Sequence, residues 1–361
     1  MEAEILNEYT FNRISSEQIH HKHEIRCFLS EHGLGIDDDI EYMILACDEN
    51  DQIIACGGIA ANILKSIAIS ETLQGSGFSL KLMTELTSLA YELGRFSLFL
   101  FTKPENVNRF RQSGFYLVEK FDSKLALMEN SPSRLIGYCN KLAEQHILGN
   151  KIGSIVMNAN PFTLGHQHLV EQACQECDWV HLFVVKEEGS DFSFIDRLTM
   201  IRAGTKHFSN LTVHSGSEYI ISRATFPTYF LKEQQLIDYV HTALDLKIFR
   251  HFIAPSLGIT HRYVGTEPVC TVTKNYNLSM YEWLENKSDE SPAIAVVEIP
   301  RIEQDNQPIS ASRVRKLLKD KNISEIRSLV PETTYSFLCR YYIYPALLVN
   351  QGKFRQINSA V

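Results

Sequence analysis

A threonine and two histidines stand where a strand gives way to a helix in the stretch SIVMNANPFTLGHQHLVEQAC, residues 154–174. The apolar run before Asn158 predicts a buried strand, and the residues after Gly165 have helical spacing. The first N–H groups of a helix have no partner within it, and with the helix dipole they form a site for phosphate. Thr163 and His166 are three residues apart, so both side chains can hydrogen-bond to an anion bound there.

His166 is expected to be a neutral hydrogen-bond donor, because the amino end of a helix disfavours a positively charged imidazole. Gly165 allows the backbone to approach a bound ligand closely. The competing interpretation is a helix that is capped by Thr163 and carries histidines that only face solvent. A cap explains the threonine but leaves the histidines unexplained.

A second set of chemistry-bearing residues occurs in PISASRVRKLL, residues 308–318. Ser310 and Ser312 can cap a helix there, and Arg313 and Arg315 fall in its first turns. Arginines at that end oppose the helix dipole, a cost that a bound phosphate group would offset. The alternative is a capped surface helix whose basic residues are solvated.

Two predicted strands end in polar residues. Lys186 follows the strand in WVHLFVVKEE, where a solvated strand end and a contact to phosphate are both open interpretations. Gly265, Thr266 and Glu267 follow the strand in RYVGTEP. Ligands of a doubly wound sheet lie outside the carboxyl ends of its strands, so these residues could meet the base and ribose of a nucleotide.

The elements that must position these residues follow two patterns. From residue 9 to about 128, a helix-like start is followed by two apolar strands around a polar turn, and then by strands mixed with helices. From Lys151 onward, apolar runs alternate with helices, which is typical of a parallel sheet with crossover helices. An α/β protein is therefore predicted, with an α+β domain before a Rossmann-like, doubly wound domain. The predicted segments are a first domain at 1–130, a helical linker at 131–150, a second domain at 151–345 and a tail at 346–361.

The bulk composition excludes several classes of function. The net charge is −8 without a block of basic residues, which argues against nucleic acid as a partner. No apolar run approaches the ~20 residues that span a bilayer, and the amino end lacks a signal pattern, so a cytoplasmic protein without a membrane partner is expected. The eight cysteines are scattered and read as reduced thiols. Cys174 and Cys177 have metal-ligand spacing but no second pair, and no metal site is predicted.

The turn NPFTLGH resembles the T/H-x-G-H signature of the nucleotidyltransferase superfamily, and PISASRVRKLL resembles that superfamily's I-S-x-[ST]-x-x-R motif. The resemblance implies that the turn holds the phosphates of ATP and that Arg315 binds them as pyrophosphate leaves. Thr163, His166 and Arg315 become the candidate catalytic residues. The candidate ATP-binding residues are Asn160, Phe162, Thr163, Gly165, His166, Lys186, Gly265, Ser310, Ser312 and Arg315.

In the first domain, two glycines precede an apolar helix in ETLQGSGFSLKLMTEL. This run resembles the Q/R-x-x-G-x-G/A loop of GNAT acetyltransferases, whose amide groups hold the pyrophosphate of coenzyme A. A helix that only needs small residues at its start is the alternative. Phe110 stands where many members of that family have a tyrosine general acid, and a phenyl ring cannot donate a proton. The loop is therefore expected to bind the extended arm of a coenzyme A-like group without transferring an acetyl group. The candidate coenzyme A-arm-binding residues are Gln74, Gly75, Ser76, Gly77 and Ser79.

The motifs NPFTLGH, ATFPTYFLK, YVGTEP and ISASRVR together resemble the citrate lyase ligase family, over nearly the whole chain. In that family, ATP and acetate form acetyl-AMP. The acetyl group then passes to the thiol of a phosphoribosyl-dephospho-coenzyme A group on the acyl carrier subunit of citrate lyase. The resemblance therefore implies acetate and that carrier as partners. Mg²⁺ is expected with ATP because it neutralises phosphate charge.

Two other functions remain open at the level of the sequence. One is a nucleotidyltransferase that moves AMP to a phosphorylated small metabolite, which would need further basic residues for that substrate. The other is a non-enzymatic sensor of coenzyme A or nucleotide. Phe110 favours a sensor in the first domain only, whereas His166 and Arg315 argue against it in the second.

Overall fold

The computed structural model describes residues 9–21, 23–74, 76–186, 190–220, 234–267, 271–286 and 291–343. The chain divides into two compact units: Met1–Ile136 with Pro227–Val240, and Gly137–Phe226 with His241–Val361. The predicted tail at 346–361 and the stretch ATFPTYFLK at 224–232 lie outside the described residues. None of the helices in the described ranges is long and apolar enough to cross a membrane.

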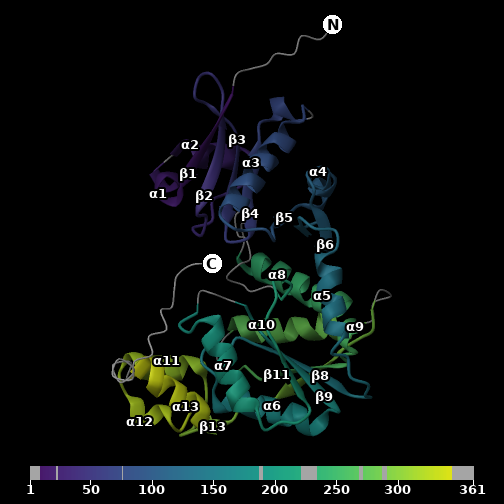
Figure 1. The fold of residues 1–361 in the computed structure, drawn as a ribbon, viewed down its shortest axis with the longest axis vertical. Coiled ribbons are helices and arrows are strands. Elements are labelled where there is room, and N and C mark those ends of the chain that lie inside the picture. Colours follow the sequence, from purple (N-terminus) through teal and green to yellow (C-terminus); the bar gives the residue numbers. More distant parts are fainter. Residues whose placement is uncertain are drawn as a thin grey trace. The chain divides into compact units, whose positions relative to one another are not determined.

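The first unit has a mixed α+β fold (Figure 1). Residues 10–15 form an edge strand paired with β2, so the helix-like start expected from residue 9 begins only at Ser16. Pairing with the neighbouring strand decides the backbone before that residue. The described elements are β1 (Thr10–Ser15), α1 (Ser16–His21), α2 (His23–Glu31), β2 (Tyr42–Cys47), β3 (Ile53–Ala60), β4 (Ile63–Ile69), η1 (Glu71–Leu73), α3 (Phe78–Glu92), β5 (Phe99–Thr102), η2 (Pro104–Asn106), α4 (Val107–Gln112), β6 (Tyr116–Phe121) and β7 (Leu125–Glu129).

Within the described residues, the first unit's strands form a seven-stranded sheet in the order β1-β2-β3-β4-β5-β7-β6. β4 and β5 are parallel, and α3 is the crossover between them. Their pairing covers only Ile63 with Phe99 and Leu64 with Leu100, although β4 continues to Ile69. The two strands therefore diverge along most of β4, and no strand within the described residues pairs with that part of the β4 edge.

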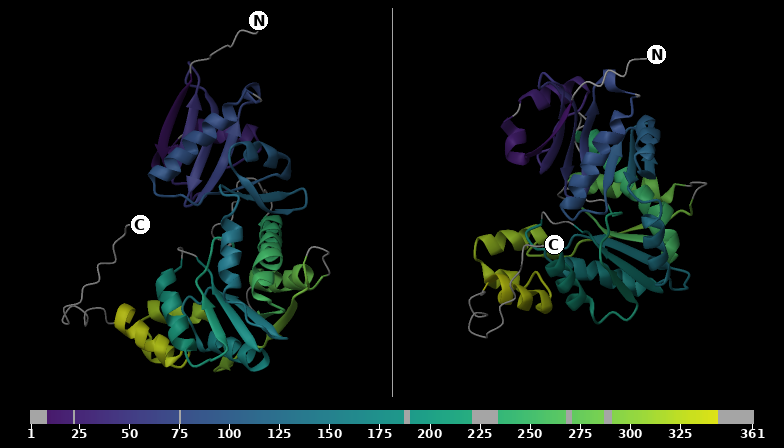
Figure 2. Two further views of the ribbon diagram at one scale, coloured as in Figure 1. Left: turned by 45° about the vertical axis from the view of Figure 1, so that its right-hand side comes forward. Right: turned by 45° about the horizontal axis from the view of Figure 1, so that its top comes forward.

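Helix α3 packs on this sheet with one apolar stripe. Phe78, Leu82, Leu86 and Leu89 are buried at helical spacing and join the core formed with Ile44, Ile59, Leu64 and Leu100. Figure 2 shows α3 lying along the strands of this sheet. The core fixes the start of α3 next to the end of β4, which is the place where the glycine loop was predicted.

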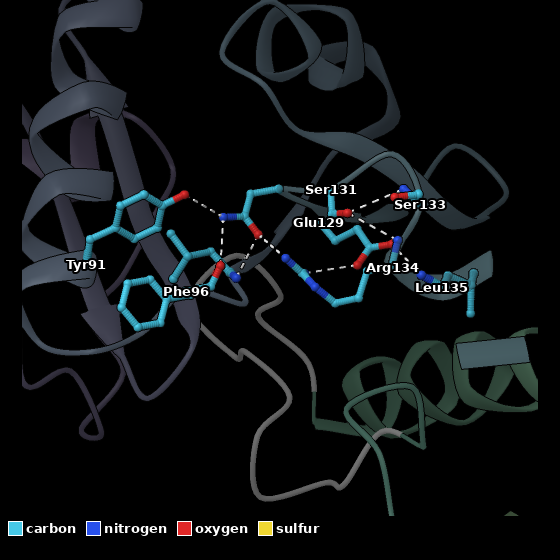
Figure 3. A network of polar contacts seen from close by, with 9 residues as sticks. Tyr91, Phe96, Glu129, Ser131, Ser133, Arg134 and Leu135 are labelled. Carbon is cyan, nitrogen blue, oxygen red and sulfur yellow. Dashed lines mark hydrogen bonds and ion pairs between the residues drawn. The ribbon is translucent and has the colours of Figure 1, made fainter. Parts of the chain in front are cut away.

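A polar network closes the first unit and begins helix α5 (Arg134–Ala143) (Figure 3). The Asn130 carboxamide accepts from the Leu98 N–H at 2.9 Å and from Arg134 at 2.8 Å. Glu129, which is buried, accepts from Arg134 at 3.1 Å and from the Leu135 N–H at 3.3 Å. The Glu129 carboxylate at the start of α5 satisfies one of the helix's free N–H groups, that of Leu135, and its negative charge interacts favourably with the helix dipole.

The second unit alternates strands and helices as predicted. Its described elements are the rest of α5, β8 (Ile152–Met157), α6 (Leu164–Glu176), β9 (Trp179–Val184), α7 (Phe194–Thr205), β10 (Leu211–His214), α8 (Gln234–Ile248), η4 (Phe249–Ile253), α9 (Ala254–Leu257), β11 (His261–Gly265), α10 (Thr271–Met280), η5 (Tyr281–Glu285), β12 (Ala295–Ile299), β13 (Glu303–Gln304), β14 (Gln307–Pro308), α11 (Ala311–Lys319), α12 (Ile323–Ile326), α13 (Glu332–Leu338) and η6 (Cys339–Ile343). Three of these, η4, η5 and η6, are π-helical segments.

The described strands β8 to β12 form a parallel sheet in the order β10-β9-β8-β11-β12. The chain adds β9 and β10 on one side of β8, and then β11 and β12 on the other side. The main core lies between one face of the sheet and the helices α6, α7, α11 and α13. On the other face, Arg262 of β11 lies 4.6 Å from the Phe249 ring, so η4 covers that side. This doubly wound arrangement confirms the predicted fold class, and it puts the β8–α6 turn beside the point where the strand order reverses.

A fully buried arginine holds the carboxyl ends of β8 and β9 together. The Arg197 guanidinium donates to the Asn158 carbonyl at 2.9 Å, to Asn158 Oδ1 at 2.5 Å and to the Val185 carbonyl at 3.0 Å. Its Nε donates to the Phe192 carbonyl at 3.2 Å. The next residue in the turn, Ala159, has a φ of 49°, a conformation that costs about 1–3 kcal/mol and persists only when its surroundings hold it.

Replacement of this side chain should destabilise the second unit strongly. In Arg197→Met, the buried Phe192 carbonyl and the partly buried carbonyls of Asn158 and Val185 lose this donor, and we expect the free energy of unfolding to fall by about 3 kcal/mol. Both tryptophans of the chain, Trp179 and Trp283, lie in the second unit, so urea unfolding followed by tryptophan fluorescence reports on it. Arg202→Met, at an exposed position on the same helix, is the control. Equal unfolding midpoints for the two variants would contradict this role of Arg197.

Candidate functional site

The turn after β8 is held by a reciprocal cap between Thr163 and His166. Thr163 is the N-cap of α6, and its Oγ1 accepts from the His166 N–H at 3.4 Å. In return, the Thr163 N–H donates to His166 Nδ1 at 3.0 Å, and the hydroxyl lies 2.9 Å from the same nitrogen. Because Nδ1 accepts the backbone N–H, the proton of the neutral ring is on Nε2. The cap therefore fixes both the orientation and the tautomer of His166.

Burial and the positive charge of Arg301 lower the pKa of His166 to about 4. The ring stacks on the buried Phe162 at a centroid distance of 5.8 Å, and part of its surface remains exposed. Phe162 is itself packed into the core, so its ring holds the stacked histidine ring in place from the core side. At neutral pH, His166 thus presents an uncharged N–H donor, as the sequence predicted.

The second predicted motif meets the first at the start of α11. The Ser310 side chain caps this helix by accepting from the Arg313 N–H at 3.2 Å, and Ser312 donates to Ser310 Oγ at 3.3 Å. A Cβ at Gly165 would lie only 2.9 Å from the Ile309 carbonyl oxygen. Gly165 is therefore required by the close approach of the two helix starts, which brings both sets of N–H groups to one place.

Arg315 is fixed across the β8–α6 turn. Its Nη1 donates to the Asn160 carbonyl at 2.6 Å, and its Nε pairs with Asp191 at 3.0 Å. The Asn160 side chain in turn accepts from the Phe192 N–H at 3.1 Å. Arg313 differs, because it donates to the Gln304 carbonyl at 3.2 Å in the β13–β14 hairpin. One of the two predicted arginines thus joins the turn with Thr163 and His166.

The two remaining predicted residues of this unit lie at strand ends. Lys186 pairs with Glu218 at 3.0 Å, both side chains being partly exposed. Gly265 ends β11, and its carbonyl accepts from Asn277 at 3.1 Å. Among the described residues, none except Gly265 itself and its chain neighbours has an atom within 4 Å of a Cβ placed on Gly265, so this part of the chain leaves open space beside it. Their roles toward a nucleotide remain predictions.

The predicted arm-binding loop precedes α3 in the first unit. Gly77 is the N-cap of α3 with a φ of 78°, and no side chain caps the helix. Ser79 is exposed in the first turn, and no acidic residue occurs there. Gln74 and Ser76 bond to the backbone of the preceding η1 segment, through the Gln74 N–H at 3.1 Å and the Ser76 hydroxyl at 2.6 Å. Gly75 lies outside the described residues.

Sequence reasoning missed three residues that contact the site: Asp191, Arg197 and Arg301. Arg197 bonds to the turn from α7, and Asp191 pairs with Arg315 from the loop before α7. No local pattern marks either residue. Arg301 follows β12, so the rule that strand ends line the ligand site could have found it. Within the described ranges, no group of three or more histidine, cysteine, aspartate or glutamate side chains could hold a metal ion.

Fold and site together define the class: a GNAT-like unit joined to a Rossmann-like unit of the nucleotidyltransferase type. Residues 152–338 match the family model described as the citrate lyase ligase C-terminal domain. Citrate (pro-3S)-lyase ligase of Haemophilus influenzae is 50% identical over 91% of this chain and 98% of its own. The citrate (pro-3S)-lyase ligase of Klebsiella pneumoniae is 53% identical over 86% of this chain and 90% of its own. Among solved structures, an acyl-CoA N-acyltransferase from Pseudomonas aeruginosa has a TM-score of 0.30 and 11% identity, over 34% of this chain and 100% of its own. The chain belongs to the citrate lyase ligase family.

The His166 ring should stay neutral well below neutral pH. Nitrogen-15 NMR is expected to report the Nε2–H tautomer at pH 7 and protonation only as the pH approaches about 4, with His166→Gln identifying the signal. In the unfolded chain the same ring takes up its proton near pH ~6.5. The unfolded state therefore binds more protons between these values, and this histidine lowers stability as the pH falls through that window. A midpoint above about 6 would contradict the burial and fixed tautomer.

Proposed function

We propose that the protein activates citrate lyase by acetylating the thiol of its acyl carrier subunit at the expense of ATP. In the first step, acetate and ATP form acetyl-AMP and pyrophosphate at the β8–α6 turn. In the second, the thiol of the phosphoribosyl-dephospho-coenzyme A group takes the acetyl group and AMP leaves. The observation that carries the proposal is the junction of the two motifs, where neutral His166 and Arg315 lie beside two helix starts.

The first step needs positioning and charge stabilisation more than a base. A carboxylic acid with a pKa near ~4.5 is ionised at pH 7, so a carboxylate oxygen can attack the α-phosphorus directly. The bond from that phosphorus to the bridging oxygen breaks, and pyrophosphate leaves with the electron pair. Arg315 and the N–H groups at the start of α11 favour the leaving pyrophosphate, and His166 Nε2–H favours an oxygen of the reacting phosphate.

The second step transfers the acetyl group from AMP to sulfur. The thiolate attacks the acetyl carbonyl, the carbon–oxygen bond to AMP breaks, and AMP leaves with the charge on its phosphate. A thiol with a pKa near ~8.5 is a few per cent ionised at pH 7, and acetyl-AMP is a reactive acyl donor. Mg²⁺ would arrive bound to the phosphates of ATP and would neutralise part of their charge.

The first unit would bind the prosthetic arm. The uncapped start of α3 offers N–H groups to the arm's pyrophosphate, and no acidic side chain in the first turn repels it. The edge of β4 that diverges from β5 offers backbone groups to the arm's amides. Phe110 is partly buried against the core of this unit, and its ring cannot act as a general acid. These features support binding of the arm without acetyl transfer by the first unit.

Acetate-dependent exchange of labelled pyrophosphate into ATP, without any carrier protein, tests the adenylation step. The wild type should exchange with acetate, whereas His166→Ala and Arg315→Ala should each lose about 100- to 1,000-fold, as for loss of an oxyanion donor. His168→Ala, two residues further along the same helix, is the control and should leave the rate unchanged. Absence of exchange with acetate, propionate or citrate, together with AMP transfer to a phosphorylated metabolite, would replace this proposal with that of a nucleotidyltransferase.

The role of the first unit is tested by moving one negative charge along α3. Ser79→Glu introduces a carboxylate at the proposed pyrophosphate site without straining the helix, and it should weaken binding of dephospho-coenzyme A by about tenfold. Thr84→Glu adds the same charge at an exposed position further along the helix and should bind as the wild type does. Calorimetry with saturating AMP present keeps the second unit occupied. Equal affinities for the two variants would mean that the arm does not bind at α3.

A further inference from the structure

Arg301 lies at the carboxyl end of β12, held by the loop that follows β11. Its backbone N–H donates to Thr266 Oγ1 at 3.3 Å, and its guanidinium pairs with the carboxylate of Glu267. The Thr266 N–H in turn donates to the Ile299 carbonyl at 2.9 Å. The Glu267 side chain is only 6% exposed, whereas that of Arg301 is 28% exposed. A buried carboxylate thus orients an arginine that remains accessible to a ligand.

The backbone places Arg301 beside the His166 turn. Its neighbour Ile302 accepts, through its carbonyl, a hydrogen bond of 3.1 Å from the Ile309 N–H. The Ile309 carbonyl is the group that approaches Gly165 so closely that a Cβ there would lie 2.9 Å away. Ile302 directly follows Arg301 in the chain, and Gly165 directly precedes His166. The two side chains are close enough for the charge of Arg301 to contribute to the lowered pKa of His166.

Arg301 and Arg315 approach the turn from opposite flanks. Arg315 bonds to Asn160 and Asp191, on the side of β8 toward β9. Arg301 lies in the loop after β12 and bonds to Thr266 and Glu267 in the loop after β11, on the other side of β8. A guanidinium has five N–H groups, and within the described part of the chain only Glu267 accepts from that of Arg301. Two arginines and two helix starts around a neutral histidine favour a bound anion.

We propose that Arg301 is a further phosphate-binding residue, which binds an oxygen of the α-phosphate of the nucleotide while Arg315 serves the departing pyrophosphate. The inference rests on the proposed use of ATP at this turn. Gly265 and the open space beside it lie on the flank of Arg301, where the base and ribose are expected. The α-phosphate is the phosphate next to the ribose, so Arg301, which lies on that flank, is the arginine expected to bind it. Glu267 is then a positioning residue.

The affinities for AMP and adenosine separate this contact from other roles, because the two ligands differ only in the α-phosphate. Calorimetry should show that Arg301→Met weakens AMP binding by about 10- to 100-fold, as expected for a lost charge-assisted bond, and leaves adenosine binding unchanged. Glu267→Gln should give a smaller loss of the same kind, because Arg301 remains but is held less firmly. Arg313→Met removes the same charge from a neighbouring arginine that bonds to the hairpin, and it should change neither affinity.

An equal loss of affinity for AMP and adenosine would overturn the proposal, because it would indicate a structural role. Unchanged AMP affinity with a raised KM for acetate would also overturn it, because Arg301 would then bind the carboxylate. Tryptophan fluorescence verifies the folding of each variant. If Arg301→Met fails to fold, the AMP and adenosine affinities of Glu267→Gln test the same contact. Both binding assays work without an acid substrate. A wild type that binds AMP more tightly than adenosine but fails to exchange pyrophosphate would refute the proposed function alone.

Discussion

A turn of irregular backbone at the end of a buried parallel strand must find partners for its own polar groups, and in this protein side chains from distant elements provide them. Arg197 of α7 donates to Asn158 and Val185, and Arg315 of α11 donates to the Asn160 carbonyl. Buried carbonyl groups without a donor are costly, so these bonds decide where the turn lies. The geometry of Thr163 and His166 depends on them.

The electrostatics of the site follow from the same arrangement. The histidine is kept neutral by burial and by a nearby arginine, and its backbone partner leaves the ring proton on Nε2. An uncharged, oriented donor and two oriented arginines suit the proposed substrate, whose negative charge changes position during the reaction. Fixed donors of this kind need no reorganisation when the charge moves, which is the basis of electrostatic catalysis. Asp191 and Glu267 orient the two arginines and offset their positive charge.

The two units divide the proposed chemistry in a way that their folds explain. A doubly wound sheet concentrates helix starts at one edge, which suits the triphosphate of ATP. A sheet whose parallel strands diverge next to an uncapped helix suits an extended arm with amides and a pyrophosphate. In the proposed scheme, the Phe110 ring supplies no proton for acetyl transfer in the first unit, and the acyl chemistry is therefore assigned to the second.

Both fold types were predictable from the sequence, because each depends on patterns that are local in the chain. The alternation of apolar runs and helices predicted the doubly wound sheet, which the parallel order of β10, β9, β8, β11 and β12 confirms. Residues 10–15 were predicted wrongly, since they have a weak apolar pattern and become a strand only by pairing with β2. The spacing predicted that Thr163 and His166 lie on one side of the same turn, because residues three apart meet on a helix start. A cap by Thr163 was only the competing interpretation, and the structure adds that the His166 side chain is its reciprocal partner.

By itself, the sequence determined the elements, the helix caps and the motifs that carry the family resemblance, since these follow from spacing along a single strand or helix. The tertiary structure alone decided that Arg315 and not Arg313 reaches the turn, that Arg197 is its buried support, and that Arg301 flanks His166. These bonds join residues far apart in the chain, and their partners are set by how helices and strands pack. Packing depends on the whole core, and no local pattern of residues encodes it.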